Sequence, residues 1–227
     1  MGGEFFGVVK PLSEEVKSQG GMDFGGRMRE LGGTAHERVE SIGESIGDLI
    51  EKVRSPYFSG YLERLGLTPA GKDAFFIGEK GESKCVPNPE SERGARAEEK
   101  LRRYGLDGVE YRDAVPDFEP CSEAVVKIDN MGVERLGLSG NFEQARLKLA
   151  EQWNESGRDG RTDWTSRDVK TWCEANNLTI HECSDRKTCM FVDGDIHETF
   201  RHSGGVSECR HRDEATGVKR LYAIFDN

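Results

Sequence analysis

Residues 178–205 read LTIHECSDRKTCMFVDGDIHETFRHSGG, and this stretch decides the fold. Side chains alternate in character over residues 178–183, which predicts a strand because successive strand residues point to opposite faces. Residues 188–192 predict a second strand that returns beside the first. Asp195 is placed to cap a new helix and Gly204-Gly205 to end it. The stretch therefore predicts a β-hairpin followed directly by a helix.

Further helices and short strands are predicted upstream of this unit. Helices are expected over residues 89–104, from Asn141 to Gly157, and from a capping box at Thr165 and Asp168 to Asn176, with strands over 108–112 and 124–128. The helix over 89–104 is expected to bury Ala95, Leu101 and Tyr104 and to keep its charged residues in solvent. Together these elements predict an α+β fold whose ββα core lies near residues 178–204.

The N-terminal part of the chain predicts a separate helical segment. Apolar residues recur over residues 35–53 at spacings of 4, 3, 4, 3 and 4, which indicates a helix with a narrow apolar seam. This helix either packs on the core of its own domain or serves docking and oligomerisation. We expect a helical lead-in or docking segment over residues 1–70 and a second domain over residues 71–227.

Composition and charge limit the classes of function. The 227 residues carry a net charge of −10, and each third of the chain is acidic. A nucleic-acid-binding protein normally shows a basic patch, so such a function needs a local basic cluster or a bound cation. No apolar run approaches the ~20 residues that cross a membrane, so no membrane segment is expected.

Six cysteines form no C-x-x-C pair and no zinc-finger spacing. They are expected to be buried, reduced thiols that behave as small hydrophobic residues. Disulfide bonds in an oxidising compartment are the alternative.

Four of the five histidines lie between residues 181 and 211. Histidine is a common ligand of Zn²⁺ and similar ions, and its pKa also suits a general base. A hairpin that presents His181 and Glu182 opposite a helix carrying His197 can surround one divalent cation. The alternative is that polar surface histidines cluster here by chance.

His197 and His202 are five residues apart, so on a regular helix their side chains diverge by roughly 140°. They can bind one ion together only if the helix ends before His202. His202 could instead cap the end of the helix by donating to its last carbonyl groups. His211 lies beyond the unit between two arginines and is expected to contact phosphate or solvent.

These residues carry a resemblance to a known group of proteins. The segments 178–183, 187–192 and 195–205 resemble the toxin nucleases of the HNH/endonuclease VII superfamily, and the upstream segments 78–84, 116–120 and 141–145 are also similar. The branch concerned has the pattern Trp-His-His or Trp-His-Glu, then His, then His-Thr/Ser-Gly-Gly, and forms the C-terminal domains of bacterial polymorphic toxins. The similarity covers about residues 76–212. One departure is Ile180, which stands where that branch has tryptophan.

The resemblance implies a ββα-metal core that hydrolyses nucleic acid, most often DNA, with one divalent metal ion such as Zn, Mg, Mn or Ni. Carried onto this chain, it implies His181 as general base, Glu182 as a supporting catalytic residue, and His197 and His202 as metal ligands. The branches differ in which member of the His181–Glu182 pair binds metal, so these two roles can be exchanged. Arg201, Arg210, His211 and Arg212 form a local positive cluster that could contact nucleic acid.

The resemblance also implies partners and a setting. A toxin nuclease acts on DNA in the cytoplasm of a target cell, is secreted or delivered there by a specialised system, and requires an immunity protein in the cell that makes it. The alternative function is a non-catalytic protein-interaction module that a metal ion stabilises. Degradation of a plasmid, and its loss on chelation, would separate the two.

Overall fold

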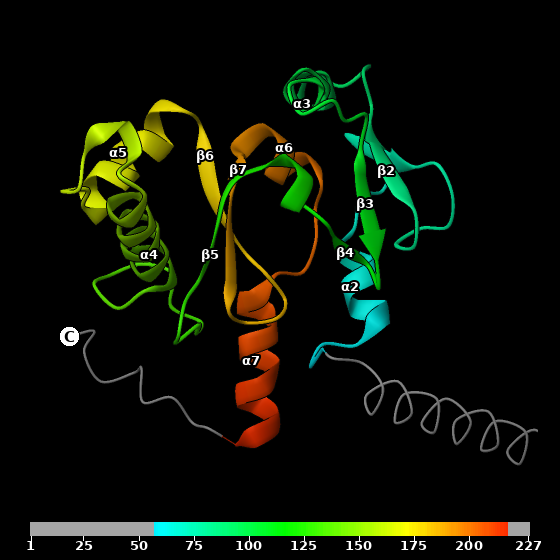
Figure 1. Ribbon diagram of the computed structural model, residues 1–227. Helices are drawn as coiled ribbons and strands as arrows, with labels where there is room; N and C mark the ends of the chain where they lie inside the picture. Colours follow the sequence, from blue (N-terminus) through cyan, green and yellow to red (C-terminus); the bar gives the residue numbers. More distant parts are fainter. Residues whose placement is uncertain (1–56, 218–227) are drawn as a thin grey trace, which may run out of the picture. The chain divides into compact units, whose positions relative to one another are not determined.

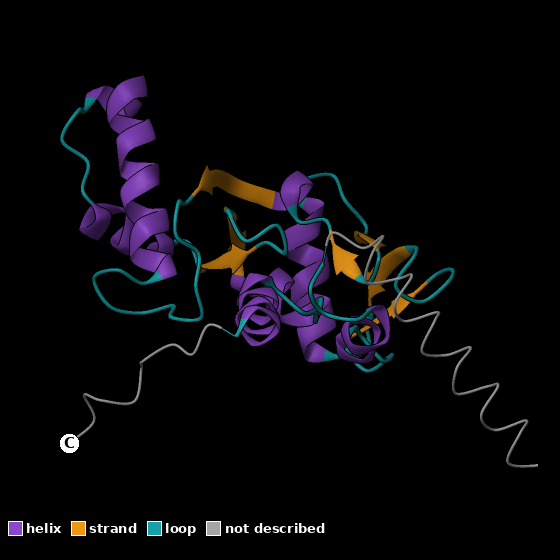
Figure 2. Cartoon of the chain, turned by 90° about the horizontal axis from the view of Figure 1, so that it is seen from below, coloured by secondary structure: helices purple, strands orange, loops and turns teal. Residues whose placement is uncertain are grey.

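The computed structural model describes residues 57–217, which form six α-helices and two antiparallel sheets (Figures 1 and 2). In chain order the elements are α2 (Tyr61–Leu67), β1 (Ala74–Phe76), β2 (Lys84–Pro87), α3 (Glu92–Arg102), β3 (Val109–Arg112), β4 (Val115–Pro116), η2 (Glu119–Cys121), β5 (Ser122–Lys127), α4 (Asn141–Ser156), η3 (Arg158–Gly160), α5 (Ser166–Ala175), β6 (Leu178–Glu182), β7 (Thr188–Asp193), α6 (Gly194–Thr199) and α7 (Gly205–Thr216). The predicted α+β class is confirmed. The predicted helix over residues 35–53 lies outside the described residues, and the division at residue 70 stays a prediction.

The predicted hairpin and helix are present as β6, β7 and α6. β7 is the central strand of a three-stranded sheet ordered β5-β7-β6, and all its pairs are antiparallel. In the hairpin, His181 lies opposite Met190 and Glu182 lies opposite Cys189. The strand from residues 124–128, predicted without a partner, supplies the third strand β5. The sheet thus holds the histidine-bearing strand β6 in a fixed register.

The start and end of α6 differ from the sequence expectation. Asp193, and not Asp195, caps the helix, because its carboxylate accepts from the backbone N–H of Asp195 at 2.9 Å. The helix ends at Thr199, and Phe200 already has a non-helical backbone. Gly204-Gly205 does not end α6. Gly204 precedes the first turn of the next helix, α7, which begins at Gly205.

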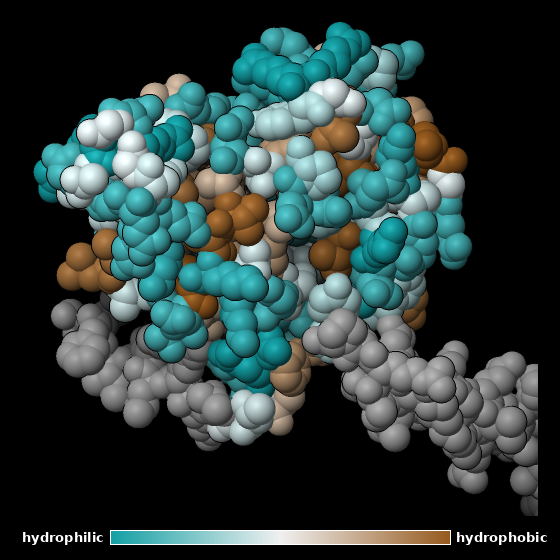
Figure 3. Space-filling model, viewed as in Figure 1, coloured by the Kyte–Doolittle hydropathy of each residue, from teal (hydrophilic) through white to brown (hydrophobic). Residues whose placement is uncertain are grey.

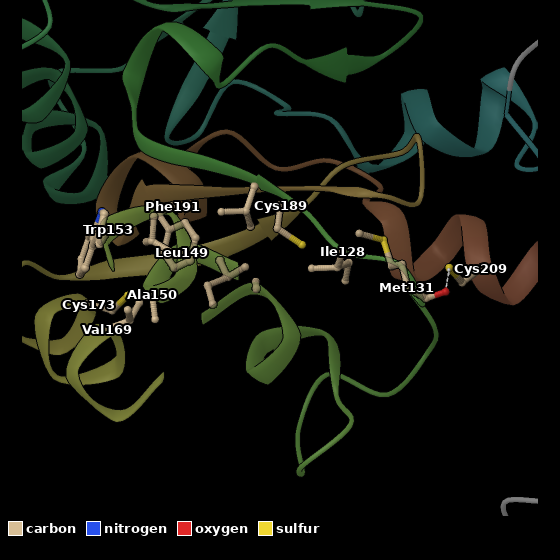
Figure 4. Packing of buried hydrophobic residues seen from close by; sticks show 13 residues of the cluster. Ile128, Met131, Leu149, Ala150, Trp153, Val169, Cys173, Cys189, Phe191 and Cys209 are labelled. Atoms are coloured by element: carbon tan, nitrogen blue, oxygen red, sulfur yellow. Dashed lines mark hydrogen bonds between the residues drawn. The ribbon is translucent and has the colours of Figure 1, made fainter. Parts of the chain in front are cut away.

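One hydrophobic core lies between this sheet and the helices α4 and α5 (Figure 4). The side of α4 that faces this core carries Ala145, Leu149 and Trp153, all buried. Full burial of a large apolar side chain stabilises a fold by roughly 1.5–3 kcal/mol, so this stripe anchors α4 firmly. Gly157 ends α4 in a left-handed conformation, and the predicted capping box of Thr165 opens α5.

A second core joins the other face of β7 to the four-stranded sheet β1-β2-β3-β4 and to α3. Because strand side chains alternate, Phe191 faces the first core while Val192 faces the second. On α3, Leu101 is buried as predicted, but Ala95 is exposed and Ala97 is buried in its place. The prediction for Ala95 was therefore wrong.

Ion pairs connect α3 to the start of α6. Lys100, expected in solvent, approaches Asp193 at 3.2 Å, and Arg96 donates to Asp195 at 2.9 Å. These contacts fix the entry of the chain into α6. The hairpin and α6 are thus held from both sides, by the two cores and by these ion pairs.

The first described residues are bound to the last helix. Glu208, fully buried on α7, accepts hydrogen bonds from the backbone N–H groups of Phe58 and Ser59 and from the Ser59 hydroxyl. The buried Arg64 of α2 donates to the carbonyl groups of Ser59 and Asp113. We call these contacts the Glu208 clasp. The clasp links the first described residues, just before α2, to α7 at the other end of the described chain.

The six cysteines all lie in the described part, and none forms a disulfide. Five are buried, and burial raises the pKa of the Cys85, Cys121 and Cys183 thiols to about 12. Five of the six cysteines thus pack as the small, buried hydrophobic residues that the sequence predicted, while Cys183 is half-buried. Among the described residues, no helix is both long and apolar enough to span a membrane. The face seen in Figure 3 is mostly hydrophilic and carries separate hydrophobic patches.

Candidate metal centre

Three histidines from separate segments meet at one point. His181 comes from β6, His197 from α6, and His202 from the segment that follows α6. The Nε2 atom of His202 lies 3.0 Å from Nδ1 of His181, and Nε2 of His197 lies 3.3 Å from the same atom. One ring nitrogen of each histidine lies within 4.8 Å of the others, which is close enough for a single ion to contact all three.

The early end of α6 is what brings His202 to the cluster. A continued helix would turn His202 away from His197, as the sequence analysis found. Because helical geometry stops at Thr199, the chain bends at Phe200 and directs His202 back toward His181. The stated condition for joint binding by His197 and His202 is therefore met.

His202 also contacts the last turn of α6, the second role considered for it. Its Nδ1 lies 2.8 Å from the carbonyl oxygen of Phe200, so a proton on Nδ1 donates to that oxygen. With Nδ1 protonated, Nε2 presents its lone pair to the cluster. A hydrogen bond on one imidazole nitrogen commonly orients the other toward a metal. Capping and ligation are thus compatible in one ring.

Phe118 forms the base of the cluster. Its ring is fully buried, and its centroid lies 5.0 Å from that of His181, 5.6 Å from that of His197 and 5.3 Å from that of His202. The apolar ring restricts all three imidazoles and keeps water from their inner side. The sequence analysis did not identify Phe118, although it lies within the similar segment 116–120.

Burial keeps the three imidazoles neutral. Loss of solvation lowers the pKa of His181 well below 6.5, that of His197 to about 3 and that of His202 to about 4. Repulsion between the rings lowers the pKa further for His181 and His197, and the positive charge of Arg135 lowers it for all three. A histidine must be neutral to bind a metal, so the cluster has its lone pairs available at pH 7.

Glu182 is bound to other residues and is not in the three-histidine cluster. One carboxylate oxygen accepts from Nε of Arg135 at 2.7 Å, and the other accepts from the side-chain amide of Asn141 at 2.7 Å. The Asn141 side chain also bonds to both the N–H and the carbonyl of Gly132. Sequence reasoning singled out Glu182 but not these two partners.

A cavity of about 270 Å³ opens over the histidines. Besides the three imidazoles it is lined by Arg135, Glu182, Glu198 and Arg201. The structure therefore brings together five of the residues selected from the sequence: His181, Glu182, His197, Arg201 and His202.

The remaining selected residues lie on α7 and do not line this cavity. His211 lies 2.8 Å from Glu63 of α2, and Arg212 pairs with the neighbouring Asp213. Arg210 is exposed. Their contact with nucleic acid stays a prediction, and it would have to occur at a surface separate from the histidines.

Comparison with known protein families gives one match, over part of the chain. Residues 108–204 match the family model of the DNase/tRNase domain of colicin-like bacteriocins. The matched segment runs from β3 to just beyond His202 and contains all three histidines. No curated protein and no solved structure matches the chain. The match supports a bacteriocin-type nuclease toxin, a class that acts on nucleic acid.

Proposed function

We propose that the protein is a metal-dependent endonuclease toxin that hydrolyses phosphodiester bonds in DNA at the three-histidine cluster. One observation carries the proposal: His181, His197 and His202 converge within the segment that matches the bacteriocin nuclease domain. The HNH type of mechanism belongs to this proposal, and its support is the β6-β7-α6 arrangement of the histidines.

The donor set fits one divalent metal ion. Three neutral imidazoles suit Zn, Ni and similar ions, whereas Mg²⁺ prefers oxygen ligands. His181, His197 and His202 would hold the ion, and Phe118 beneath them restricts their rings. When bound, such an ion supplies charge stabilisation to the phosphodiester and its leaving oxygen. Of the candidate metals, the all-nitrogen set favours Zn and Ni.

We assign His181 as the third ligand and not as a separate general base. Its Nδ1 lies 3.0 Å and 3.3 Å from the ring nitrogens of His202 and His197, so the three nitrogens are close enough to bind the same ion. A general base needs a lone pair free to accept a proton from water, and a ligand has already committed it. The resemblance allows His181 as the metal-binding member of the His181–Glu182 pair.

Cleavage of nucleic acid tests the proposed function. Purified protein is stripped of metal, reloaded separately with Zn, Ni, Mn or Mg, and incubated with supercoiled plasmid and with transfer RNA. We expect nicking and linearisation of the plasmid that chelator abolishes and that added metal restores. Cleavage of the RNA alone would make the protein a ribonuclease. Metal binding without cleavage of either would favour a non-catalytic, metal-stabilised interaction module.

The biological setting follows from the same class. A colicin-like domain suggests a secreted toxin that acts on target cells. We propose that it acts in the cytoplasm of those cells, where DNA is accessible, and that an immunity protein protects the producing cell.

A further inference from the structure

Arg135 stands at the edge of the histidine cavity without being part of the cluster. It lies on the connection between β5 and α4, and it was not selected from the sequence. It lines the cavity together with the three histidines. About half of its side chain is exposed (53%), so solvent and ligands can reach it.

Two buried side chains hold Arg135 in this position. Glu182, only 2% exposed at its side chain, accepts from Nε of Arg135, and the buried Asn141 holds the other oxygen of Glu182. The backbone adds a further restraint, because the N–H of Phe142 in the first turn of α4 donates to the carbonyl of Arg135 at 3.1 Å. A buried carboxylate is costly unless it is paired. Glu182 therefore serves as the anchor of this arginine.

The anchoring uses a single donor of the guanidinium. Arginine carries five N–H donors, and only the one on Nε bonds to Glu182. Among the described residues, the terminal amino groups of Arg135 make no further hydrogen bond or ion pair. An arginine held through Nε alone keeps its two terminal nitrogens available, and the guanidinium fork is the geometry that binds phosphate oxygens.

The charges around His181 favour an anion on this side. His181 also lines a second, larger cavity of about 760 Å³, which carries Glu110, Asp117, Glu119 and Asp185 against Arg112 and Lys127. That excess of carboxylates repels a phosphodiester. The cavity of Arg135 is lined by two arginines, Arg135 and Arg201, and by two carboxylates, Glu182 and Glu198, so it lacks that excess of negative charge. A phosphodiester is therefore repelled less on this side than in the larger cavity.

We propose that Arg135, positioned by Glu182 and Asn141, binds a phosphate of the nucleic-acid substrate at the histidine cavity. This inference rests on the proposed nuclease function and assigns Glu182 the role of a positioning residue. Glu182 acts through the arginine and neither binds metal nor takes a proton from water.

Binding of DNA without turnover is the first test. A short fluorescein-labelled duplex is titrated with metal-free protein in chelator over a series of salt concentrations. Arg135→Gln, which keeps a donor for Glu182, is expected to weaken binding about tenfold and to reduce the salt slope by about one. Arg135→Lys should fall between wild type and Arg135→Gln. Arg167→Gln removes the same charge from an exposed site on α5, and its affinity should stay within about twofold of wild type.

A double-mutant cycle tests the role of Glu182. Glu182→Gln keeps an oxygen for Asn141 but loses the charge that holds Arg135. It should weaken DNA binding in the wild-type background and add less than about twofold in the Arg135→Gln background, because residues that act as a unit are not additive. Metal content by native mass spectrometry should remain near wild type in each variant, while thermal unfolding should show a loss of stability in Arg135→Gln, where the buried Glu182 charge has lost its cation.

Each outcome decides between the proposals. Cleavage by wild type with unchanged affinity and salt slope in Arg135→Gln would overturn this inference and leave the nuclease function standing. The contrary outcome is that Glu182→Gln lowers turnover about 10²–10⁴-fold without changing DNA affinity, both in the wild-type background and in the Arg135→Gln background. That result would make Glu182 a general base and overturn its positioning role. Wild-type protein that neither binds nor cleaves DNA or RNA would overturn the function and the inference together.

Discussion

At the scale of single residues, the site depends on how each imidazole is held. The Phe200 carbonyl fixes His202, and burial against Phe118 keeps all three rings neutral. The sequence predicted the histidines because they are concentrated in one short stretch. Phe118 and Arg135 could not be predicted, because they are far from His181 along the chain and reach the site only through the fold. Spacing along the chain carries no information about such contacts.

Metal stoichiometry distinguishes a ligand from a base at His181. His181→Ala and His197→Ala should each lose the bound metal and the cleavage activity, because each removes one of the three nitrogens proposed to bind the same ion. His211→Ala is the matched control, since His211 contacts Glu63 outside the cavity. Calorimetric titration with Zn²⁺ measures both affinity and stoichiometry. Full metal occupancy in His181→Ala with cleavage abolished would restore His181 as the general base.

At the scale of secondary structure elements, the hairpin and α6 were predicted from alternation and capping patterns, and both exist. The cap was misplaced by two residues because Asp193 and Asp195 are both good capping residues, and only the end of β7 decides between them. The sequence indicated the early end of α6 only as the condition under which His197 and His202 could bind one ion. Nothing local to residues 199–202 required it, since the bend at Phe200 follows from burial of that ring in the second core.

The turn between β6 and β7 contains a carboxylate whose ionised form stabilises the hairpin. Burial alone would raise the pKa of Asp185, but the hydroxyl and N–H of Thr188 and the N–H of Lys187 donate to it and lower the pKa below 3.8. Since the folded pKa is the lower one, this stabilisation is present above the unfolded pKa near 3.8 and disappears as the pH falls through the folded value.

Asp185→Asn should therefore be less stable than wild type at pH 7, and the difference should shrink as the pH falls below about 4. Urea unfolding of both proteins at a series of pH values measures this difference. Any loss of bound metal at low pH affects both proteins alike and does not change the difference between them. A difference that is the same at pH 7 and at low pH would show that the charge of Asp185 is irrelevant to the turn.

The start of α7 requires glycine because it approaches the hairpin closely. A Cβ atom on Gly205 would lie 2.4 Å from the carbonyl oxygen of Cys183 and 2.7 Å from Sδ of Met131. Gly205→Ala should lower the free energy of unfolding by about 1–3 kcal/mol, as overpacking of a filled site does. Gly60→Ala, where a Cβ would meet nothing within 4 Å, should be nearly neutral. Thermal or urea unfolding of the two variants tests the comparison, and equal stabilities would contradict it.

At the scale of the whole molecule, the acidic charge of −10 argued against a nucleic-acid enzyme, yet residues 108–204 match a nuclease domain. The two observations are compatible because charge acts locally. At the histidine cavity Arg135 and Arg201 balance Glu182 and Glu198, while most other charges of the described chain face solvent or pair with each other. Net charge alone could not reveal this, since it averages over the surface.

Toxicity in cells tests the biological setting. Expression of the wild-type chain in a bacterium should stop growth and degrade the chromosome, whereas His197→Ala should be tolerated at the same protein level. Co-expression of a cognate immunity protein, sought among the genes beside the toxin gene, should restore growth. Harmless expression of folded, metal-loaded wild-type protein would contradict the toxin proposal.

The Glu208 clasp should contribute to the free energy of unfolding because its hydrogen bonds are made to a buried carboxylate. Glu208→Ala leaves the N–H and hydroxyl groups of the buried Ser59 without their acceptor, and an unsatisfied buried group costs about 1–3 kcal/mol. Glu214→Ala removes the same charge from an exposed position of α7 and should change little. Urea unfolding compares the two, and equal effects would show that the buried contacts do not matter.

The clasp also has a consequence for the order of folding. Its hydrogen bonds join residues 149 and 150 positions apart. Closing so long a loop in an unfolded chain costs conformational entropy, and this cost is smaller once the chain between the two ends has already folded. The clasp should therefore close late, after the hairpin and both cores have formed. During synthesis the ribosome produces the whole histidine cluster before it reaches Glu208. The last folding event is thus the joining of two distant parts of the chain, and it follows assembly of the site.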